Sequence, residues 1–144
     1  MTVLVGVSPS ADSRAAIRLA AQEARYRNGP LIAIMAYPAA RAWSPAVRPA
    51  VQKLTPADDR AATDDFLRGA VSDALGDDAK GVERRAVAGA AGRALVQAAG
   101  QTNAQLMVLA TRQGVARVLG AVYQYVLLNA PCPVLVVPEA STNH

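Results

Sequence analysis

The residues of this chain that could bind a ligand gather near its C-terminal end, around a loop between an apolar run and a helical pattern. The run Leu106–Ala110 has the character of a buried strand, Gly114 lies in the loop, and Gly120 opens the helical pattern. Loop amides and the positive end of a helix dipole both favour negative charge. Arg112 and Arg117 flank this point and could complement an anion. A small anionic ligand is therefore one candidate occupant.

The same residues also fit a purely structural interpretation, which the sequence leaves open. Gly114 could supply a positive φ in a short turn, and Gly120 could serve a turn or close packing. Arginines in loops are most often solvated, which would account for Arg112 and Arg117 without a ligand.

Groups able to catalyse a reaction are scarce. The single histidine, His144, is the last residue, which leaves none for acid–base catalysis or a metal site. The single cysteine, Cys132, stands between two prolines without a neighbouring cation to lower its pKa, so we interpret it as a small buried residue. A carboxylate cluster falls near the start of a predicted helix, where it fits the helix dipole and a solvated face: Asp58, Asp59, Asp64 and Asp65. We expect no enzyme and no metal site.

Composition points to one soluble globular domain over residues 1–144. The chain is 52% hydrophobic and 18% charged, which excludes a disordered protein. Its net charge of +4 is carried by scattered arginines among only 4% aromatic residues, which does not favour nucleic acid as a partner. A single cysteine suits a reducing compartment, and no apolar run reaches the roughly 18 residues that span a membrane. We expect a cytoplasmic protein with no membrane association.

Apolar runs alternate with amphipathic segments along the whole chain. Strands are predicted at 2–7, 31–37, 82–87, 105–110 and 134–137, the third as an edge strand because it contains Glu83, Arg84 and Arg85. Helices are predicted after a cap at Ser10 with Asp12 in the first turn, from 56 to a stop at Gly76, over 90–99 with a stop at Gly100, and over 120–129. The order predicts a parallel sheet with helices on both faces.

The helical periodicity also predicts which side chains are buried. The first helix should bury its stripe of small and aliphatic residues: Ile17, Ala20, Ala21 and Ala24. The second should bury Phe66, Leu67, Ala70, Val71 and Ala74, and the last should bury Val122 and Val126. The proline-rich segment 38–56 is predicted to be an irregular connection at the C-terminal edge of the sheet.

Several segments resemble one known family when they are taken in order and at their spacing. They are Val3–Val7, Arg14–Ala21, Gly92–Val96, Gln105–Leu109 and, most specifically, the ending Asn129–Val137 (Asn-Ala-Pro-Cys-Pro-Val-Leu-Val-Val). Together they resemble a universal stress protein over nearly the whole chain. The resemblance implies a three-layer α/β fold of the adenine nucleotide alpha hydrolase-like type. Its five-stranded parallel sheet has the order 3-2-1-4-5, with helices on both faces.

The resemblance also implies where a nucleotide would bind, and the sequence departs from that pattern. Many members of the family bind ATP with an aspartate after the first strand and a motif G-x2-G-x9-G-[ST] after the fourth. In this sequence the motif residues are replaced: Ser8 occupies the position of the aspartate, Ala110 and Gln113 those of the first two glycines, and Ala121 that of the final Ser or Thr. The loop between Gln113 and Gly120 is three residues shorter than the motif requires. What remains is a vestigial nucleotide site: Ser8, Ala110, Arg112, Gly114, Arg117, Gly120 and Ala121.

The expected function is that of a non-catalytic, stress-response or regulatory binding protein that does not bind ATP through the usual motif and needs no cofactor. It is expected to form a homodimer through the apolar strand Val134–Val137. The alternative is an ATP- or AMP-binding member that uses backbone amides near Gly114 and Gly120. A phosphoester hydrolase is a third reading, with only Ser8, Ser10 and Asp12 near the site. An Asp12 carboxylate that points into the cleft would favour binding or chemistry, and one that caps the first helix would not.

Overall fold

The computed structural model describes residues 1–9, 11–37, 56–111 and 120–139, and its elements alternate between strand and helix. The strands are β1 (Thr2–Gly6), β2 (Leu31–Tyr37), β3 (Glu83–Ala88), β4 (Ala104–Thr111) and β5 (Val134–Pro138). The helices are α1 (Arg14–Tyr26), α3 (Pro56–Leu75), the short 3-10 helix η2 (Gly76–Gly81), α4 (Ala91–Thr102) and α5 (Ala121–Asn129). No helix in these ranges has the length and apolar character to cross a membrane. The predicted connection over 38–55 lies outside the described residues.

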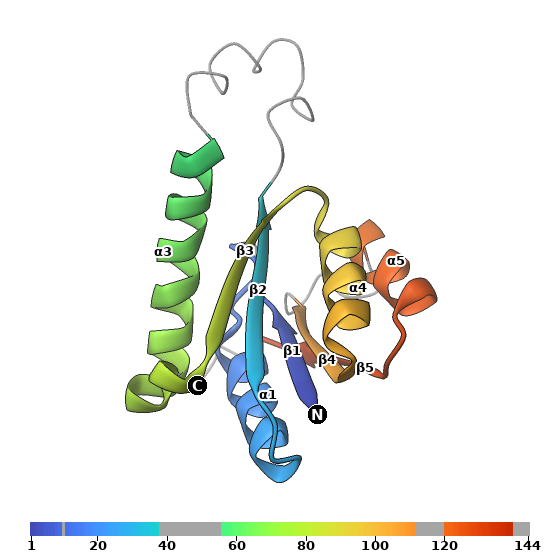
Figure 1. The fold of residues 1–144 in the computed structure, drawn as a ribbon, viewed down its shortest axis with the longest axis horizontal. Helices are drawn as coiled ribbons and strands as arrows, with labels where there is room; N and C mark the ends of the chain where they lie inside the picture. The colour runs from blue at the N-terminus through green and yellow to red at the C-terminus, as the bar shows by residue number, and fades with distance from the viewer. Residues whose placement is uncertain (10, 38–55, 112–119, 140–144) are drawn as a thin grey trace.

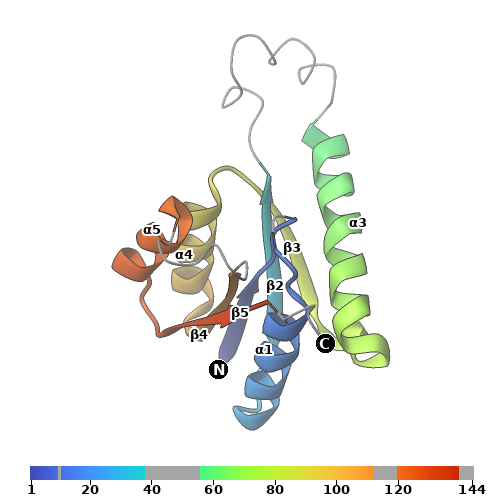
Figure 2. The ribbon, with the colours of Figure 1, turned by 180° about the vertical axis from the view of Figure 1, so that it is seen from behind.

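The five strands form one parallel sheet in the order β3-β2-β1-β4-β5, which confirms the predicted topology. Helices α1 and α3 cover one face of the sheet, and α4 and α5 cover the other (Figures 1 and 2). The direction in which the chain winds reverses between β1 and β4. In open α/β sheets, ligands bind beyond the carboxyl ends of the strands at such a switch point.

The central strands are buried on both faces, which is why they read as unbroken apolar runs. Alternate residues of β1 enter different halves of the core. Val3 and Val5 pack with the helices α1 and α3, whereas Leu4 packs in the cluster formed with α4 and α5. All three side chains are fully buried.

The two edge strands of the sheet differ in chemistry. Strand β3 pairs only with β2, as predicted for an edge, and it carries the charged residues Glu83, Arg84 and Arg85. Arg84 Nε donates to Asp64 Oδ1 on α3 at 3.1 Å, and Arg85 pairs with Glu83. Strand β5 pairs only with β4 and is apolar, with Leu135 38% exposed.

Two helix boundaries differ from the prediction. Helix α1 begins at Arg14 with Ser13 at the N-cap, so Asp12 precedes the helix; Ser10 lies outside the described residues. Helix α4 continues through Gly100 to Thr102, and its C-cap, Asn103, adopts the left-handed conformation with φ 52°. Asparagine tolerates this conformation because its short polar side chain can form local hydrogen bonds. Gly100 therefore lies inside the last turns of the helix and does not stop it.

The predicted buried stripes are correct except at their margins. The four positions on α1 and Leu67, Val71, Ala74 and Val126 are all buried, and Ala70 is partly buried. Phe66, however, is 45% exposed, because the buried stripe of α3 runs through Thr63, Leu67 and Val71 and leaves Phe66 on its flank. Val122 is 39% exposed, one turn before the fully buried Val126, and it borders a cavity instead of the core.

The adjacent residues Leu67 and Phe66 give a direct test of this packing. Leu67→Ala is expected to lower the free energy of unfolding by about 2–5 kcal/mol because it leaves a cavity in the core. Phe66→Ala should cost less than about 1.5 kcal/mol, since nearly half of that side chain is already in water. Urea denaturation of both variants measures the difference. Equal losses would place Phe66 in the core.

Candidate functional site

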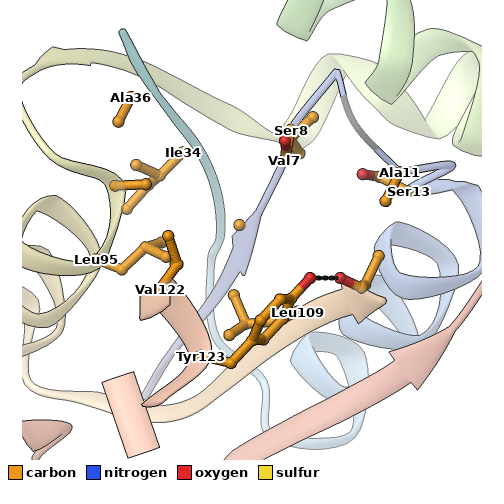
Figure 3. A pocket seen from close by; sticks show the side chains of 13 residues that line it. Val7, Ser8, Ala11, Ser13, Ile34, Ala36, Leu95, Leu109, Val122 and Tyr123 are labelled. Atoms are coloured by element: carbon orange, nitrogen blue, oxygen red, sulfur yellow. Dashed lines mark hydrogen bonds between the residues drawn. The ribbon is translucent and has the colours of Figure 1, made fainter. Parts of the chain in front are cut away.

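A cavity of about 130 Å³ opens at the carboxyl end of the sheet, where β1 and β4 lie side by side. Residues from both faces of the sheet reach it (Figure 3). Most of its wall is apolar, supplied by side chains that include Ile34, Leu95, Leu109 and Val122. The polar side chains in the wall are Ser8, Ser13 and Tyr123, and none of the described lining residues is charged. The cavity lies at the switch point that the resemblance marks for a ligand.

Tyr123 closes one side of this cavity. Its hydroxyl donates a hydrogen bond to the carbonyl oxygen of Ala110, at the position of the first motif glycine (Figure 3). Burial raises the pKa of the Tyr123 hydroxyl, so the group keeps the proton that it donates. The partner of this hydroxyl lies 13 residues earlier in the chain, at the end of β4, and only the fold brings the two groups together.

Asp12 caps the start of α1. The backbone N–H of Arg14 donates to Asp12 Oδ1 at 3.0 Å, and the Arg14 guanidinium also donates to both carboxylate oxygens. The backbone N–H of Asp12 donates in turn to Glu139 Oε2 at 2.9 Å, and the N–H of Glu139 donates to Thr111 O at 2.9 Å. Two carboxylates of the protein therefore already accept from amides at the start of α1, so these amides are not free to bind an anion.

The Asp12–Arg14 contact predicts a dependence of stability on pH. The hydrogen bonds from Arg14 lower the pKa of Asp12 from 3.8 to about 2. A carboxyl with a lower pKa in the folded state stabilises the fold above about pH 4, and this contribution disappears as the pH falls through about 2.

Asp12→Asn is therefore expected to be less stable than the wild type at pH 7, by about 0.5–1 kcal/mol because the pair is partly in water. The difference should shrink towards zero between about pH 4 and pH 2, where the wild-type carboxyl takes up its proton. Urea denaturation of both proteins at pH 7, 4 and 2 measures it. A difference that does not change with pH would show that the Asp12 charge contributes nothing.

Ser13 is a site residue that the sequence did not single out. It occupies the N-cap of α1, but its side chain makes no capping hydrogen bond. The residue is only 6% exposed, and its hydroxyl oxygen has no hydrogen-bond partner among the described residues. The sequence predicted the cap at Ser10, three residues before the serine that stands at the N-cap in the structure.

A second, wider cavity of about 390 Å³ lies between the start of α1 and α3. Its wall includes Asp12, Arg14, Phe66 and Asp73. It shares Ser13, along with Val7, Ser8 and Ala11, with the first cavity. The two cavities therefore meet at the loop between β1 and α1.

The predicted vestigial site is brought together only in part. Ser8 and Ala110 line the first cavity, while Gly120 and Ala121 form the N-cap and first residue of α5. Gly120 has φ −68°, and a Cβ added there would meet nothing within 4 Å in the described part of the protein. Neither a left-handed turn nor close packing within those residues therefore requires a glycine at 120. The predicted residues Arg112, Gly114 and Arg117 lie outside the described residues.

The remaining reactive groups are structural. Cys132 packs against the core cluster of α4 and α5, and burial raises the pKa of its thiol, which favours the unreactive protonated form. Asp58 and Asp59 lie in the first turn of α3, and Asp64 and Asp65 pair with Arg68. No group of histidine, cysteine and carboxylate side chains that could hold a metal occurs among the described residues.

Comparisons with known proteins agree with this fold. A sequence model of the Universal stress protein family matches residues 1–138. The universal stress protein UspA from Lactobacillus plantarum superimposes with a TM-score of 0.73 and is 25% identical, covering 95% of this chain and 97% of its own. The sequence matches none of the curated proteins with which it was compared.

Two further similar structures are complexes with a nucleotide. A universal stress protein in complex with cAMP is 29% identical, with a TM-score of 0.67 and coverage of 97% of this chain and 98% of its own. The universal stress protein from Archaeoglobus fulgidus in complex with dAMP is 22% identical, with a TM-score of 0.64 and coverage of 95% and 97%. The fold and the family match define an α/β protein of the adenine nucleotide alpha hydrolase-like type. This chain belongs to the universal stress protein family.

Proposed function

We propose that this protein is a non-catalytic, stress-response member of its family that acts in the cytoplasm as a homodimer. In this proposal its cleft does not hold ATP through the usual motif. The observation that carries it is the described wall of the cleft cavity, which contains no charged side chain and has Ser8 where the family motif has an aspartate. A serine hydroxyl accepts a hydrogen bond from a ribose or base more weakly than a carboxylate does.

Three hydrogen bonds support the same proposal. Amides at the start of α1 donate to the carboxylates of Asp12 and Glu139, which leaves those donors unavailable to a phosphate. The Asp12 carboxylate caps the helix, which is the outcome that disfavours chemistry in the cleft. The Tyr123 hydroxyl donates a hydrogen bond to the carbonyl oxygen of Ala110 at the end of β4, so that oxygen already has a partner.

A nucleotide-binding role remains the second candidate, favoured by a specific observation. Helix α5 begins at Gly120 without a side-chain cap, so its first amides are not satisfied by a capping side chain. Two structurally similar universal stress proteins form complexes with cAMP and dAMP. Backbone amides near Gly120 could hold a phosphate in a rearranged loop.

Native mass spectrometry of the purified protein separates the two candidates. We expect the mass of the polypeptide without a nucleotide, and twice that mass for the dimer. A carried mass equal to AMP or ATP would favour the second candidate. Heat-denatured extract of the same sample, examined for adenine absorbance, serves as the control for a nucleotide that is lost during ionisation.

The proposed dimer rests on the free edge of β5 and on the apolar surface of α5. Strand β5 has a neighbour on one side only, and Leu135 is 38% exposed. On α5, Leu127 and Leu128 are 48% and 84% exposed. An apolar edge strand can pair with a second copy of itself, and a two-fold axis buries the same surface on both subunits.

A further inference from the structure

The buried hydroxyl of Ser13 lacks a hydrogen-bond partner among the described residues. A polar group removed from water without a partner costs on the order of 1–3 kcal/mol, and such groups are rare in folded proteins. Ser13 is only 6% exposed, and its Oγ has no partner in the part of the chain that the structure describes. Although Ser13 stands at the N-cap of α1, its side chain makes no capping hydrogen bond to the helix. The hydroxyl instead lines the cavity at the ends of β1 and β4, as Figure 3 shows.

The cavity has the size and lining of a site for one small ring. Its volume of about 130 Å³ is close to that of an engineered apolar cavity of about 150 Å³ that binds benzene. Ile34, Leu95, Leu109 and Val122 supply aliphatic walls, and Tyr123 adds an aromatic ring. An apolar ring would fill this space, while a polar atom on the ring would reach Ser13.

The charges around the cavity favour an uncharged ligand. None of its described lining residues is charged, so within this part of the wall a buried ionised group would lose its hydration without gaining an opposite charge. The nearby carboxylate of Asp12 is held by Arg14, and that of Glu139 accepts from the Asp12 amide.

We propose that this cavity binds a small, uncharged, ring-sized molecule with one hydrogen-bonding group, which the Ser13 hydroxyl anchors. The proposal rests on the proposed function, because it names the class of ligand for the same cleft. It differs from the nucleotide-binding alternative in requiring no phosphate and no charged partner. Ser13 would then contribute to ligand selection and not to the stability of α1.

Three probes of similar size test the proposal: phenol, toluene and benzoate. Chemical-shift titration of the ¹⁵N-labelled protein gives their affinities. Phenol and toluene are expected to bind, and benzoate is not. Ser13→Ala should weaken phenol binding by about threefold to tenfold, the loss expected for one hydrogen bond, and should leave toluene unchanged. An equal effect on both ligands, tighter binding of benzoate, or no binding of phenol would each overturn the proposal.

Two further variants locate the ligand. Val122→Trp places a large side chain at the wall of the first cavity and should abolish the binding of both phenol and toluene. Phe66→Ala alters the wall of the second cavity only, so it should leave both affinities unchanged. If Phe66→Ala weakens binding while Val122→Trp does not, the ligand sits in the second cavity and the proposal is wrong.

The stability of the ligand-free Ser13→Ala variant separates a ligand-binding role from a structural role. Removing an unpaired buried hydroxyl should leave the free energy of unfolding unchanged or raise it, because alanine needs no partner. A clear loss of stability would mean that the hydroxyl serves the fold, which would overturn the proposal. Failure of all probes to bind refutes this inference but not the proposed function. Micromolar binding of ATP refutes the proposed function whatever the probes do.

Discussion

Titration with ATP and magnesium is expected to give no binding in the low micromolar range. Each hydrogen bond lost to a charged or polar ligand group is worth on the order of 1–3 kcal/mol. Losing two such contacts weakens binding by about a hundredfold or more. The sequence departs from the family motif at Ser8, Ala110, Gln113 and Ala121, and its loop is three residues short. The helix dipole at the start of α5 would contribute only about 0.3–2 kcal/mol to the binding of a phosphate.

Isothermal titration calorimetry measures this directly, and the Archaeoglobus fulgidus relative titrated with dAMP provides a positive control. Titration of this protein with dAMP under the same conditions extends the test to a ligand with a single phosphate. A low micromolar dissociation constant for ATP would show that the shortened loop holds a triphosphate in another way. The contacts to the triphosphate would then lie outside the described part of the cleft.

Replacing Leu135 by lysine is expected to convert the proposed homodimer into a monomer. Leu135 lies on β5, an outer strand of the sheet, and is 38% exposed. In the proposed dimer, a lysine at this position would face β5 of the second subunit, which carries the same lysine. Two like charges brought together at an apolar interface lose hydration without gaining a partner. The molar mass measured by light scattering at micromolar concentration should fall from twice 14.9 kDa for the wild type to 14.9 kDa for the variant.

Two controls accompany this variant. Phe66→Lys places the same charge on an exposed apolar residue of α3, which packs on β2 and β3 and not on β5, and should leave the dimer intact (Figure 1). The double variant Leu135→Lys and Val137→Lys is a stronger disruption, but Val137 also packs against the core, so its fold must be checked by circular dichroism. A dimer that survives both charges would contradict the β5 interface. So would a wild-type protein that is monomeric at micromolar concentration.

The fold could be predicted from the sequence because its strands are buried on both faces. Continuous valine- and leucine-rich runs identify such strands, and their alternation with helices restricts the sheet to a parallel one. The strand order came from the resemblance, not from the periodicity. The errors occurred where burial depends on distant neighbours. Phe66 and Val122 each lie at the margin of an apolar stripe, and the angle of the neighbouring elements decides whether such a residue is covered.

The candidate site was predictable in its location but not in its chemistry. Ser8 and Ala110 could be placed at the cleft because the resemblance fixes the ends of β1 and β4. Ser13 could not, because local sequence does not distinguish a serine that caps a helix from one whose hydroxyl faces a cavity. The bonds from Tyr123 to Ala110 and from Asp12 to Glu139 join residues that are 13 and 127 positions apart. Such contacts follow from the packed fold and leave no mark in a single sequence.

The contrast between the two outer strands of the sheet limits how far the protein can assemble. A sheet with two apolar edges can add copies at both ends and grow into a fibre. Here only β5 offers such an edge, since β3 presents Glu83, Arg84 and Arg85, with Arg84 tied to Asp64 on the neighbouring helix. When two copies pair through β5, the outermost strands of the continuous ten-stranded sheet are both copies of β3. In the proposed dimer, growth by edge pairing would therefore stop at two subunits, because both outer edges would carry the charged residues of β3.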